Sequence, residues 1–414
     1  MDDADSNNYN NSDINFDVPG SVRFILDTIR NAGFEAYIVG GCVRDRLLGR
    51  EPGDWDITTS ALPEQVKGLF PVTIDTGIQH GTVMIIRGGC GYEVTTYRVD
   101  GEYKDGRHPE SVMFTPNLEE DLKRRDFTIN AFAYDPQEGI VDLFEGLSDL
   151  KNGIIRAVGD PQKRFAEDAL RIMRAVRFSA QLSFDIEEET RRAISVFAPK
   201  LVLVSAERIR VEFEKTIYSK NPSYVNQYAK LGLAEYIVPE VWDRCFLESS
   251  EDIWENIPEC ADENGKVLRL AAFFKDLKWN ECAKVMRRMT FDNRTKDLVS
   301  GVLKYTSDDE NYKWKADPVS IRGDLRIMGR ELYLLALRFK EACSEDVQEL
   351  EKQALKVLDR GDAYCIQMLD ITGADLMAAG IPQGKQIGET LNMLLDRVIE
   401  EPQLNKKEAL LKII

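Results

Sequence analysis

Residues 21 to about 150 alternate short apolar runs, typical of strands, with amphipathic helices. Apolar residues at positions 22, 25, 26 and 29 recur at helical spacing, and runs rich in Val, Ile and Thr lie between turn residues. This pattern predicts a mixed sheet with helices packed against it. The expected helices are 22–29, 43–48 and 63–70, and the expected strands are 36–39, 54–58, 72–74, 82–86 and 92–98.

Beyond residue 160 the pattern changes to one helix after another. Asp160 stands before Pro161, which places a good N-cap residue before the amino acid that best fits the first helical position. From there onward the apolar spacing is helical, and strand-like runs are almost absent. We therefore expect an α+β protein: an N-terminal head with a mixed β-sheet and helices, followed by an elongated all-α region.

The chain divides into several parts, because 414 residues are too many for one ordinary core. The first 17 residues are acidic and rich in Asn without one Lys or Arg, so we expect them to be disordered. A long loop is expected at 100–118, which is rich in Gly, Asp, Pro and charge. The expected domains are a disordered segment 1–17, the head 18–152, a helical neck 153–220, a helical body 221–310 and a helical tail domain 311–414.

Composition narrows the class of protein. Hydrophobic residues make up 43% of the chain and charged residues 30%, which is typical of a soluble globular protein. No apolar stretch has transmembrane length, and the acidic start differs from the basic and then apolar pattern of a secretion signal. Seven cysteines without a CxxC spacing argue against a disulfide framework and a zinc site. We therefore expect a cytoplasmic protein with no membrane partner.

The net charge bears on nucleic-acid binding. The chain carries 54 Lys and Arg against 71 Asp and Glu, a net charge of −17, which is unfavourable for binding a polyanion. Any RNA contact therefore needs a local basic patch. Residues 163–177 supply one, because they contain five basic and two acidic side chains.

Asp54 and Asp56, separated by Trp55, follow closely on the run Val-Gly-Gly-Cys-Val-Arg-Asp at 39–45. On an extended strand, carboxylates at i and i+2 project to one face, where they can hold a pair of hard cations. Mg²⁺ prefers oxygen ligands and leaves positions for phosphate oxygens, so the pair indicates phosphoryl or nucleotidyl transfer. Glu93, on a later predicted strand, is the candidate third carboxylate, because a neighbouring strand could bring it beside the pair.

The glycines upstream fit the same chemistry. Gly40 and Gly41 allow backbone N–H groups to approach a triphosphate, and Arg44 adds a charged donor suited to phosphate. Each fragment alone is more often a plain turn or a polar strand. At this spacing, the two together favour a nucleotide site.

The basic patch at 163–177 predicts a second cluster of functional side chains, on one face of a helix. If the segment is one helix, Glu167, Arg171 and Arg174 fall within roughly 60° of one another at about 100° per residue, with Asp168 and Arg177 flanking them. A solvated helix face held by i,i+4 ion pairs would explain the same charges. The sequence pattern leaves both interpretations open.

The bases of nucleotides make the functional interpretation specific. Cytosine and adenine each present an amine donor beside a ring-nitrogen acceptor, whereas uracil and guanine present a carbonyl beside an N–H. A carboxylate next to a guanidinium, as in Asp168 and Arg171, presents an acceptor beside a donor and so matches C and A. Uracil or guanine would leave polar groups unpaired, which a closed site rejects strongly.

Two further runs complete the set of motifs. Residues 123–131 read Lys-Arg-Arg-Asp-Phe-Thr-Ile-Asn-Ala, and residues 164–178 read Arg-Phe-Ala-Glu-Asp-Ala-Leu-Arg-Ile-Met-Arg-Ala-Val-Arg-Phe. Together with the glycine run and Asp-Trp-Asp, they make the chain closely resemble the class II tRNA nucleotidyltransferases, the CCA-adding enzymes of bacteria. The resemblance is dense over 20–220 and looser beyond.

This resemblance implies the template-independent addition of C, C and A to the 3′ end of tRNA, with CTP and ATP as substrates and Mg²⁺ as cofactor. The helical region is implied to hold the tRNA, and family members often form homodimers. The implied metal and catalytic residues are Asp54 and Asp56, with Glu93 as a catalytic carboxylate. The implied nucleotide contacts are Gly40, Gly41 and Arg44 at the triphosphate, Arg125 at the phosphates or sugar, Asp126 at the ribose, Asp168 and Arg171 at the base, and Arg174 and Arg177.

Three related functions stay open. A bacterial poly(A) polymerase shares the head motifs, although the run Thr-Gly-Ile-Gln-His-Gly-Thr-Val at 76–83 favours the CCA enzyme. An enzyme that adds only the final A is also compatible with these motifs, and so is an RNA-binding relative without catalysis. The segment 105–109 argues against an enzyme that adds only CC, because that type resembles the family with a shortened loop. The two histidines, His80 and His108, exclude a phosphohydrolase domain built on clustered His and Asp.

Overall fold

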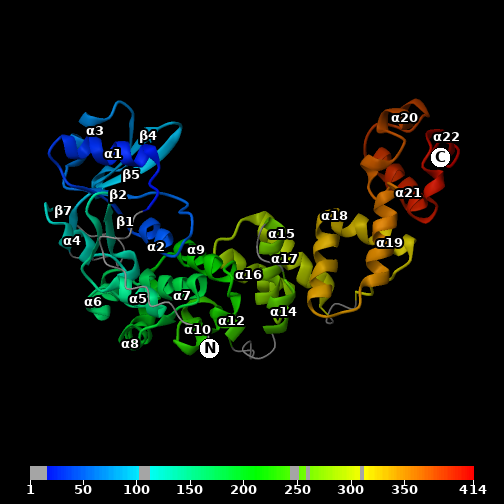
Figure 1. Cartoon of the computed structure of the whole chain (residues 1–414). Coiled ribbons are helices and arrows are strands. Elements are labelled where there is room, and N and C mark those ends of the chain that lie inside the picture. The colour runs from blue at the N-terminus through cyan, green and yellow to red at the C-terminus, as the bar shows by residue number, and fades with distance from the viewer. Residues whose placement is uncertain (1–15, 102–111, 243–250, 258–261, 308–311) are drawn as a thin grey trace, which may run out of the picture. The chain divides into compact units, whose positions relative to one another are not determined.

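The computed structural model describes residues 16–101, 112–242, 251–257, 262–307 and 312–414 (Figure 1). This part of the chain forms two compact units, which divide between Pro239 and Glu240. The finer division into head, neck, body and tail domains stays a prediction.

The first unit contains a seven-stranded sheet, which confirms the predicted mixed sheet with helices against it. The strand order is β3-β4-β5-β2-β1-β8-β9. Neighbouring strands are antiparallel except for β2 and β5, which run parallel. The strands are β1 (Ala36–Val39), β2 (Ile57–Thr59), β3 (Thr73–Gly77), β4 (Thr82–Arg87), β5 (Cys90–Thr96), β8 (Phe132–Asp135) and β9 (Gly139–Asp142).

The core of the head packs on this sheet. Helix α1 (Gly20–Asn31) buries its apolar residues at 22, 25, 26 and 29, so the predicted helical stripe is confirmed. Phe16 is also buried, and its ring centroid lies 4.5 Å from that of Tyr134. Phe16 therefore packs in the core, although it falls in the segment 1–17 that is expected to be disordered. Helices α2 (Gly41–Leu47) and α3 (Pro63–Leu69) follow the sequence prediction closely.

Two predictions about strands need correction. Strand β2 begins at Ile57, so Asp54 and Asp56 lie in the segment just before it rather than within it. The carbonyl of Asp56 still accepts a hydrogen bond from Val39 N at 3.0 Å, which keeps this segment beside β1. The loop expected at 100–118 contains paired strands, because β7 (Val112–Phe114) runs antiparallel to β6 (Arg98–Asp100). The segment 105–109 lies outside the described residues.

The helix expected through 167–177 is wrong at one point. Helix α6 (Pro161–Glu167) ends before Asp168, which has extended backbone angles of φ −141° and ψ 105°, and α7 (Leu170–Leu182) begins two residues later. Asp168 Oδ1 accepts from Leu170 N at 3.0 Å, and this local bond competes with helix continuation. The predicted cap at the start of α6 is confirmed, because the Asp160 side chain accepts from Gln162 N at 2.9 Å.

Short helices and strands complete the first unit. Some of these elements connect the sheet to α7, and others follow α7 in the chain and pack beside it (Figure 1). They are α4 (Leu118–Lys123), η2 (Thr128–Asn130), α5 (Gly146–Asn152), β10 (Ile154–Ile155), β11 (Asp185–Ile186), α8 (Glu188–Phe197), η3 (Ala198–Leu203), α9 (Ala206–Ile217), η4 (Pro222–Val225), α10 (Asn226–Lys230) and α11 (Ala234–Ile237). The α10–α11 stretch leads into α12 (Pro239–Trp242).

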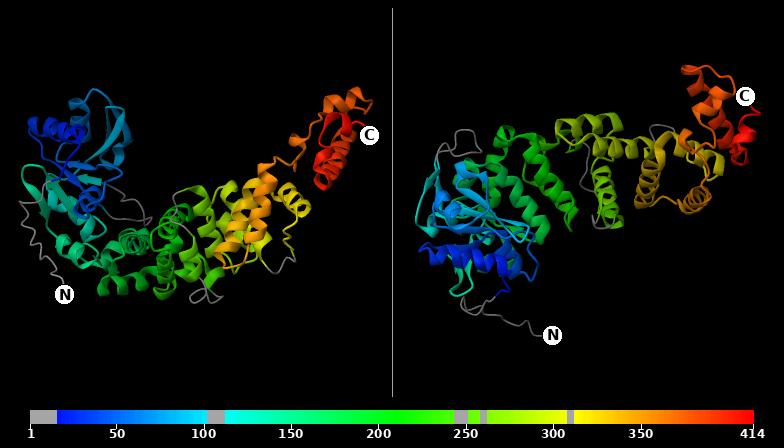
Figure 2. Two further views of the ribbon diagram at one scale, coloured as in Figure 1. Left: turned by 45° about the vertical axis from the view of Figure 1, so that its right-hand side comes forward. Right: turned by 90° about the horizontal axis from the view of Figure 1, so that it is seen from above.

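The second unit is helical over its described residues, as the apolar spacing predicted (Figure 2). Helix α18 (Pro318–Ala342) is interrupted at Gly329, whose φ of 73° leaves the helical region. The other helices are α14 (Glu251–Asn256), α15 (Glu263–Phe273), α16 (Trp279–Arg288), α17 (Asn293–Thr306), α19 (Gln348–Asp359), α20 (Gly373–Ala378), α21 (Lys385–Glu400) and α22 (Lys407–Leu410). In the described part of the chain, no helix combines the length and the apolar character needed to cross a bilayer.

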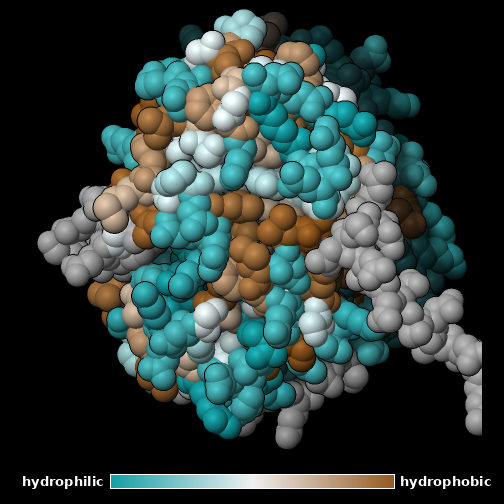
Figure 3. Space-filling view, turned by 60° about the vertical axis from the view of Figure 1, so that its left-hand side comes forward, coloured by the Kyte–Doolittle hydropathy of each residue, from teal (hydrophilic) through white to brown (hydrophobic). Residues whose placement is uncertain are grey.

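The distribution of hydrophilic and hydrophobic side chains is the one expected for a folded protein with a buried apolar core. Figure 3 shows hydrophilic side chains over most of one face, with a strip of hydrophobic ones across its middle. The largest fully buried side chains are aromatic, among them Tyr97, Tyr134, Phe127 and Phe165. The elements thus turn most of their large apolar side chains inward.

Candidate active site

Asp54 and Asp56 stand just before β2, and Glu93 lies on the neighbouring strand β5; we call these three residues the acidic edge. In the parallel pairing of β2 and β5, Ile57 is opposite Val94, so Asp56 and Glu93, which directly precede them, are neighbours across the two strands. Asp56 is half-buried and Asp54 is exposed. Burial raises the pKa of Asp56 to about 6, helped by the nearby charges of Asp54 and Glu93 and opposed by Arg125. The position expected for Glu93 is therefore confirmed, whereas its role stays a prediction.

This acidic edge fits a divalent cation. Mutual repulsion between Asp54, Asp56 and Glu93 disfavours the ionised state of Asp56, and a bound cation would relieve it. Within the described residues, no group of three or more His, Cys, Asp or Glu side chains is arranged so that it could hold a metal ion. Mg²⁺ usually takes one or two carboxylates and completes its shell with water and phosphate oxygens. An acidic pair that needs a substrate to complete the shell suits this cation.

The glycine turn lies against an arginine. Gly40 has φ 80° and precedes α2, and this conformation favours glycine. A Cβ atom at Gly40 would lie only 2.9 Å from Arg125 Nη1, so the position also lacks room for a side chain. Arg125 Nε is buried and has no hydrogen-bond partner among the described residues. A buried cationic donor beside an open backbone turn fits a phosphate group.

Arg44 is held beneath this turn rather than exposed. Its Nη1 donates to Asn130 Oδ1 at 2.6 Å, and its Nε donates to Asp45 Oδ1 at 2.9 Å. The side chain is buried, and its Cζ lies 5.1 Å from the ring centroid of Phe178. Arg44 thus connects the glycine turn to α7.

Asp126 is the centre of a buried network. Its Oδ1 accepts from Phe127 N at 2.8 Å and from Asn130 Nδ2 at 3.1 Å, and its Oδ2 accepts from Arg174 Nε at 2.7 Å. Burial alone would raise the pKa of Asp126, but Arg174 and these hydrogen bonds hold it well below the usual range. The carboxylate is therefore ionised, and the ribose contact expected for it stays a prediction.

Three of the predicted arginines surround one aromatic ring. The Cζ atoms of Arg44, Arg174 and Arg177 lie 5.1, 5.3 and 4.0 Å from the centroid of Phe178. Arg177 Nε lies 2.9 Å from Glu212 Oε2, and burial together with the charge of Arg174 lowers the pKa of Arg177 to about 10. The cluster gathers three arginines at α7, and each of them also pairs with a carboxylate: Asp45, Asp126 and Glu212 respectively.

Asp168 and Arg171 have separate partners in the structure. Asp168 Oδ2 accepts from Arg208 Nη2 at 2.8 Å, and its Oδ1 accepts from Arg208 Nη1 at 3.3 Å. Arg171 Nη1 donates to Glu167 Oε2 at 2.8 Å, and its Nη2 donates to the carbonyl of Arg124 at 2.9 Å. The two side chains are therefore held independently of each other.

The sequence analysis missed Arg208 and Glu212, both on α9. These residues are four apart in a charged helix, which is the ordinary signature of a surface ion pair. In the structure, each forms an ion pair with a residue outside α9: Arg208 pairs with Asp168, and Glu212 pairs with Arg177. Glu212 is only 4% exposed, and that burial was the feature the charge pattern did not reveal.

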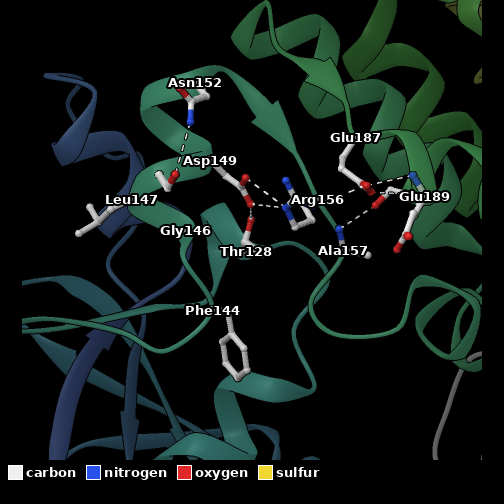
Figure 4. A network of polar contacts seen from close by, with 12 residues as sticks. Thr128, Phe144, Gly146, Leu147, Asp149, Asn152, Arg156, Ala157, Glu187 and Glu189 are labelled. Carbon is white, nitrogen blue, oxygen red and sulfur yellow. Dashed lines mark hydrogen bonds and ion pairs between the residues drawn. The ribbon is translucent and has the colours of Figure 1, made fainter.

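A second network fixes the segment that carries Arg125 and Asp126. Thr128 Oγ1 donates to Asp149 Oδ2 at 2.7 Å, and Arg156 Nε donates to the same oxygen at 3.0 Å (Figure 4). Arg156 Nη1 also lies 3.6 Å from Glu187 Oε1 at the start of α8. The site segment is thereby attached to both α5 and α8.

Comparison with protein families divides the chain into three matched parts. The model "Poly A polymerase head domain" matches residues 36–156, and "Probable RNA and SrmB- binding site of polymerase A" matches residues 183–245. A model described as tRNA nucleotidyltransferase domain 2 matches residues 266–414. The acidic edge and the glycine turn both fall within the first match.

Individual relatives match the chain over half of its length or more. The chain is 40% identical over 404 residues to the CCA-adding enzyme of Ligilactobacillus salivarius, covering 94% of each. It is 55% identical over 214 residues to the CCA-adding enzyme of Leuconostoc mesenteroides, covering 52% of this chain and 53% of that one. The crystal structure of the Bacillus stearothermophilus CCA-adding enzyme in complex with CTP aligns with a TM-score of 0.78 at 32% identity, covering 94% of both chains.

Proposed function

Because the chain belongs to the family of CCA-adding enzymes, we propose that its acidic edge, glycine turn and α7 together carry out nucleotidyl transfer to the 3′ end of tRNA. The protein is a tRNA nucleotidyltransferase that adds C, C and A from CTP and ATP. We further propose which residues carry out each step of this reaction.

One observation supports a single site. The charge of Arg125 opposes the rise in the pKa of Asp56, the carbonyl of the preceding Arg124 accepts from Arg171, and the following Asp126 pairs with Arg174. Three consecutive residues therefore connect the acidic edge with α7. We propose that one nucleoside triphosphate spans these groups.

The triphosphate end of the nucleotide would be held by the glycine turn. Gly40 N already donates to the carbonyl of Phe132 at 3.2 Å, so the donors that we assign to the phosphates are the backbone N–H of Gly41 and the guanidinium of Arg125. Arg44 supports this surface from below through Asn130. The terminal hydroxyl of tRNA attacks the α-phosphorus and gives up its proton to water; the new P–O bond forms as the bond to the bridging oxygen breaks, and pyrophosphate leaves with the electrons of that bond.

Family membership indicates dependence on a metal, and we propose Mg²⁺ at Asp54 and Asp56 with Glu93 beside them. Of the two Mg²⁺ ions proposed there, one would lower the pKa of the attacking hydroxyl and the other would balance the charge of the departing pyrophosphate. Asp54 and Asp56 would hold these cations, and the donors of the glycine turn would hold the phosphates. CTP, ATP and tRNA as substrates are consistent with work in the cytoplasm.

The base end would be read by Asp168 and Arg171. The carboxylate accepts from the exocyclic amine of C or A, and the guanidinium donates to the adjacent ring nitrogen. Arg174 and Arg177, stacked on Phe178, are the further nucleotide contacts. Holding of tRNA by the second unit and the homodimer stay predictions.

Incorporation of labelled nucleotides into tRNA that lacks its terminal CCA tests this proposal. With Mg²⁺ we expect two added residues from CTP alone and three from CTP plus ATP. Long tails from ATP alone would indicate a poly(A) polymerase, and failure to use CTP would indicate an A-adding or inactive relative. Asp54→Ala should abolish incorporation while leaving tRNA affinity unchanged; turnover at the wild-type rate would contradict the metal assignment.

A further inference from the structure

Arg208 holds the carboxylate proposed to read the base. It lies on α9, which packs along α7, and its side chain is 22% exposed. Its two terminal nitrogens form a fork on Asp168, with distances of 2.8 Å to Oδ2 and 3.3 Å to Oδ1. Such bidentate pairs fix orientation as well as charge, because the planar guanidinium matches the plane of the carboxylate.

Two oppositely charged side chains that read a base could pair with each other instead of with the base. Asp168 and Arg171 are only three residues apart, and a direct ion pair between them would use the donor and the acceptor that a base needs. In the structure, Arg208 occupies Asp168 while Glu167 occupies Arg171. The two partners come from different helices, α9 and α6, so they restrain the pair from opposite ends.

We propose that Arg208 is a positioning residue for base selection, which keeps Asp168 apart from Arg171 and orients its remaining acceptor. This proposal rests on the reading role assigned to Asp168 and Arg171 above. Arg208 acts through the carboxylate and needs no contact with the nucleotide.

The hydrogen bonds of Asp168 support this role. A carboxylate has about four acceptor directions. Among the described residues, Leu170 N and Arg208 Nη1 use Oδ1, and Arg208 Nη2 uses Oδ2. The remaining direction, on Oδ2, suits one N–H of the amine that cytosine and adenine share. Without Arg208 the carboxylate would regain freedom to rotate and to pair with Arg171.

Substitution of Arg208 tests the proposal through selectivity rather than through activity alone. The readout is the ratio of kcat/KM for CTP to that for UTP on tRNA lacking its CCA end. We expect Arg208→Gln to lower this ratio about tenfold or more, mainly through a higher KM for CTP, and Arg208→Lys to restore it in part. Arg192→Gln is the matched control, because Arg192 is 73% exposed and pairs with Glu188 within α8.

A double-mutant cycle with Asp168→Asn separates positioning from simple structural support. If Arg208 acts through Asp168, adding Arg208→Gln to Asp168→Asn should change the ratio no further. Additive effects on the ratio would overturn the proposal. An unchanged ratio in Arg208→Gln would overturn it as well; if that variant does not fold, an unchanged ratio in Arg208→Met, which keeps much of the length of the side chain without its charge, has the same meaning.

The same cycle distinguishes a failure of the reading role of Asp168 from a failure of the positioning role of Arg208. Asp168→Asn with wild-type selectivity would show that the reading role itself is wrong. Loss of selectivity in Asp168→Asn together with wild-type selectivity in Arg208→Gln would leave that role intact and remove only the role of Arg208.

Discussion

The buried carboxylate of Asp126 offers a quantitative test of the site's architecture. Asp126→Asn keeps the shape of the side chain, and the amide oxygen can still accept from Phe127 N and Asn130. The amide nitrogen, however, replaces the oxygen that now receives Arg174 Nε at 2.7 Å and Nη2 at 2.6 Å. A donor would then face a donor, and the negative charge beside Arg174 would be lost.

The size of the effect follows from burial. Breaking a buried ion pair by removing one partner costs about 3–5 kcal/mol. Asp126 is 9% exposed in its side chain, but that of Arg174 is 33% exposed and can be partly rehydrated. We therefore expect a loss of about 2–3 kcal/mol, which discounts the buried value for solvent screening.

Hydrogen exchange measures this loss locally, which matters because the chain has two compact units. In Asp126→Asn, amides of residues 124–131 and of α7 should exchange about 30- to 150-fold faster, the factor that corresponds to 2–3 kcal/mol. Peptides of α18 and α19 in the second unit serve as an internal control. Asp27→Asn, on the exposed side of α1, is the matched substitution. Exchange within threefold of wild type at 124–131 would refute the assignment of Asp126 as the centre of this network.

Three further outcomes follow from the same geometry. Folding lowers the pKa of Asp126, so its carboxylate stabilises the folded state fully above its pKa in the unfolded chain, about 3.9. This stabilisation is lost as the pH falls through the lower pKa of the folded state. The difference in exchange rate between wild type and Asp126→Asn should therefore shrink below about pH 4. Gly40→Ala should strain the turn by about 1–3 kcal/mol and lower kcat/KM for CTP at least about tenfold, whereas Gly68→Ala, where a Cβ has open space, should leave kinetics unchanged in the same initial-rate assay. Asp168→Arg combined with Arg171→Glu should shift preference toward UTP and GTP in a competition assay, and continued preference for CTP and ATP would count against reading by the protein.

The sequence was most informative where local periodicity decides structure. The stripe of α1 and the strands of the head follow from apolar spacing. The sequence indicated Gly40 only as a place where the backbone could approach phosphate, and its φ of 80° is known from the structure alone. Glu93 was placed beside Asp56 by the simple expectation that strands of one sheet are neighbours. These features depend on short segments and on general rules of sheets and turns.

The sequence was least informative where distant side chains decide structure. The break between α6 and α7 depends on Asp168, whose carboxylate is bound by Arg208, 40 residues away. A helical wheel treats 167–177 as continuous and cannot anticipate that contact. Glu212 shows the same limit, because a charged helix position is usually exposed and only the fold shows that this one is buried.

The most direct test of the account is a crystal structure of this chain with CTP, Mg²⁺ and a tRNA end that lacks the attacking hydroxyl. The account predicts one nucleotide with its phosphates between the Gly40 turn and Asp54 and Asp56, and with its amine on the carboxylate of Asp168. A base bound away from α7, or phosphates away from the acidic edge, would contradict the claim that a single nucleotide contacts both.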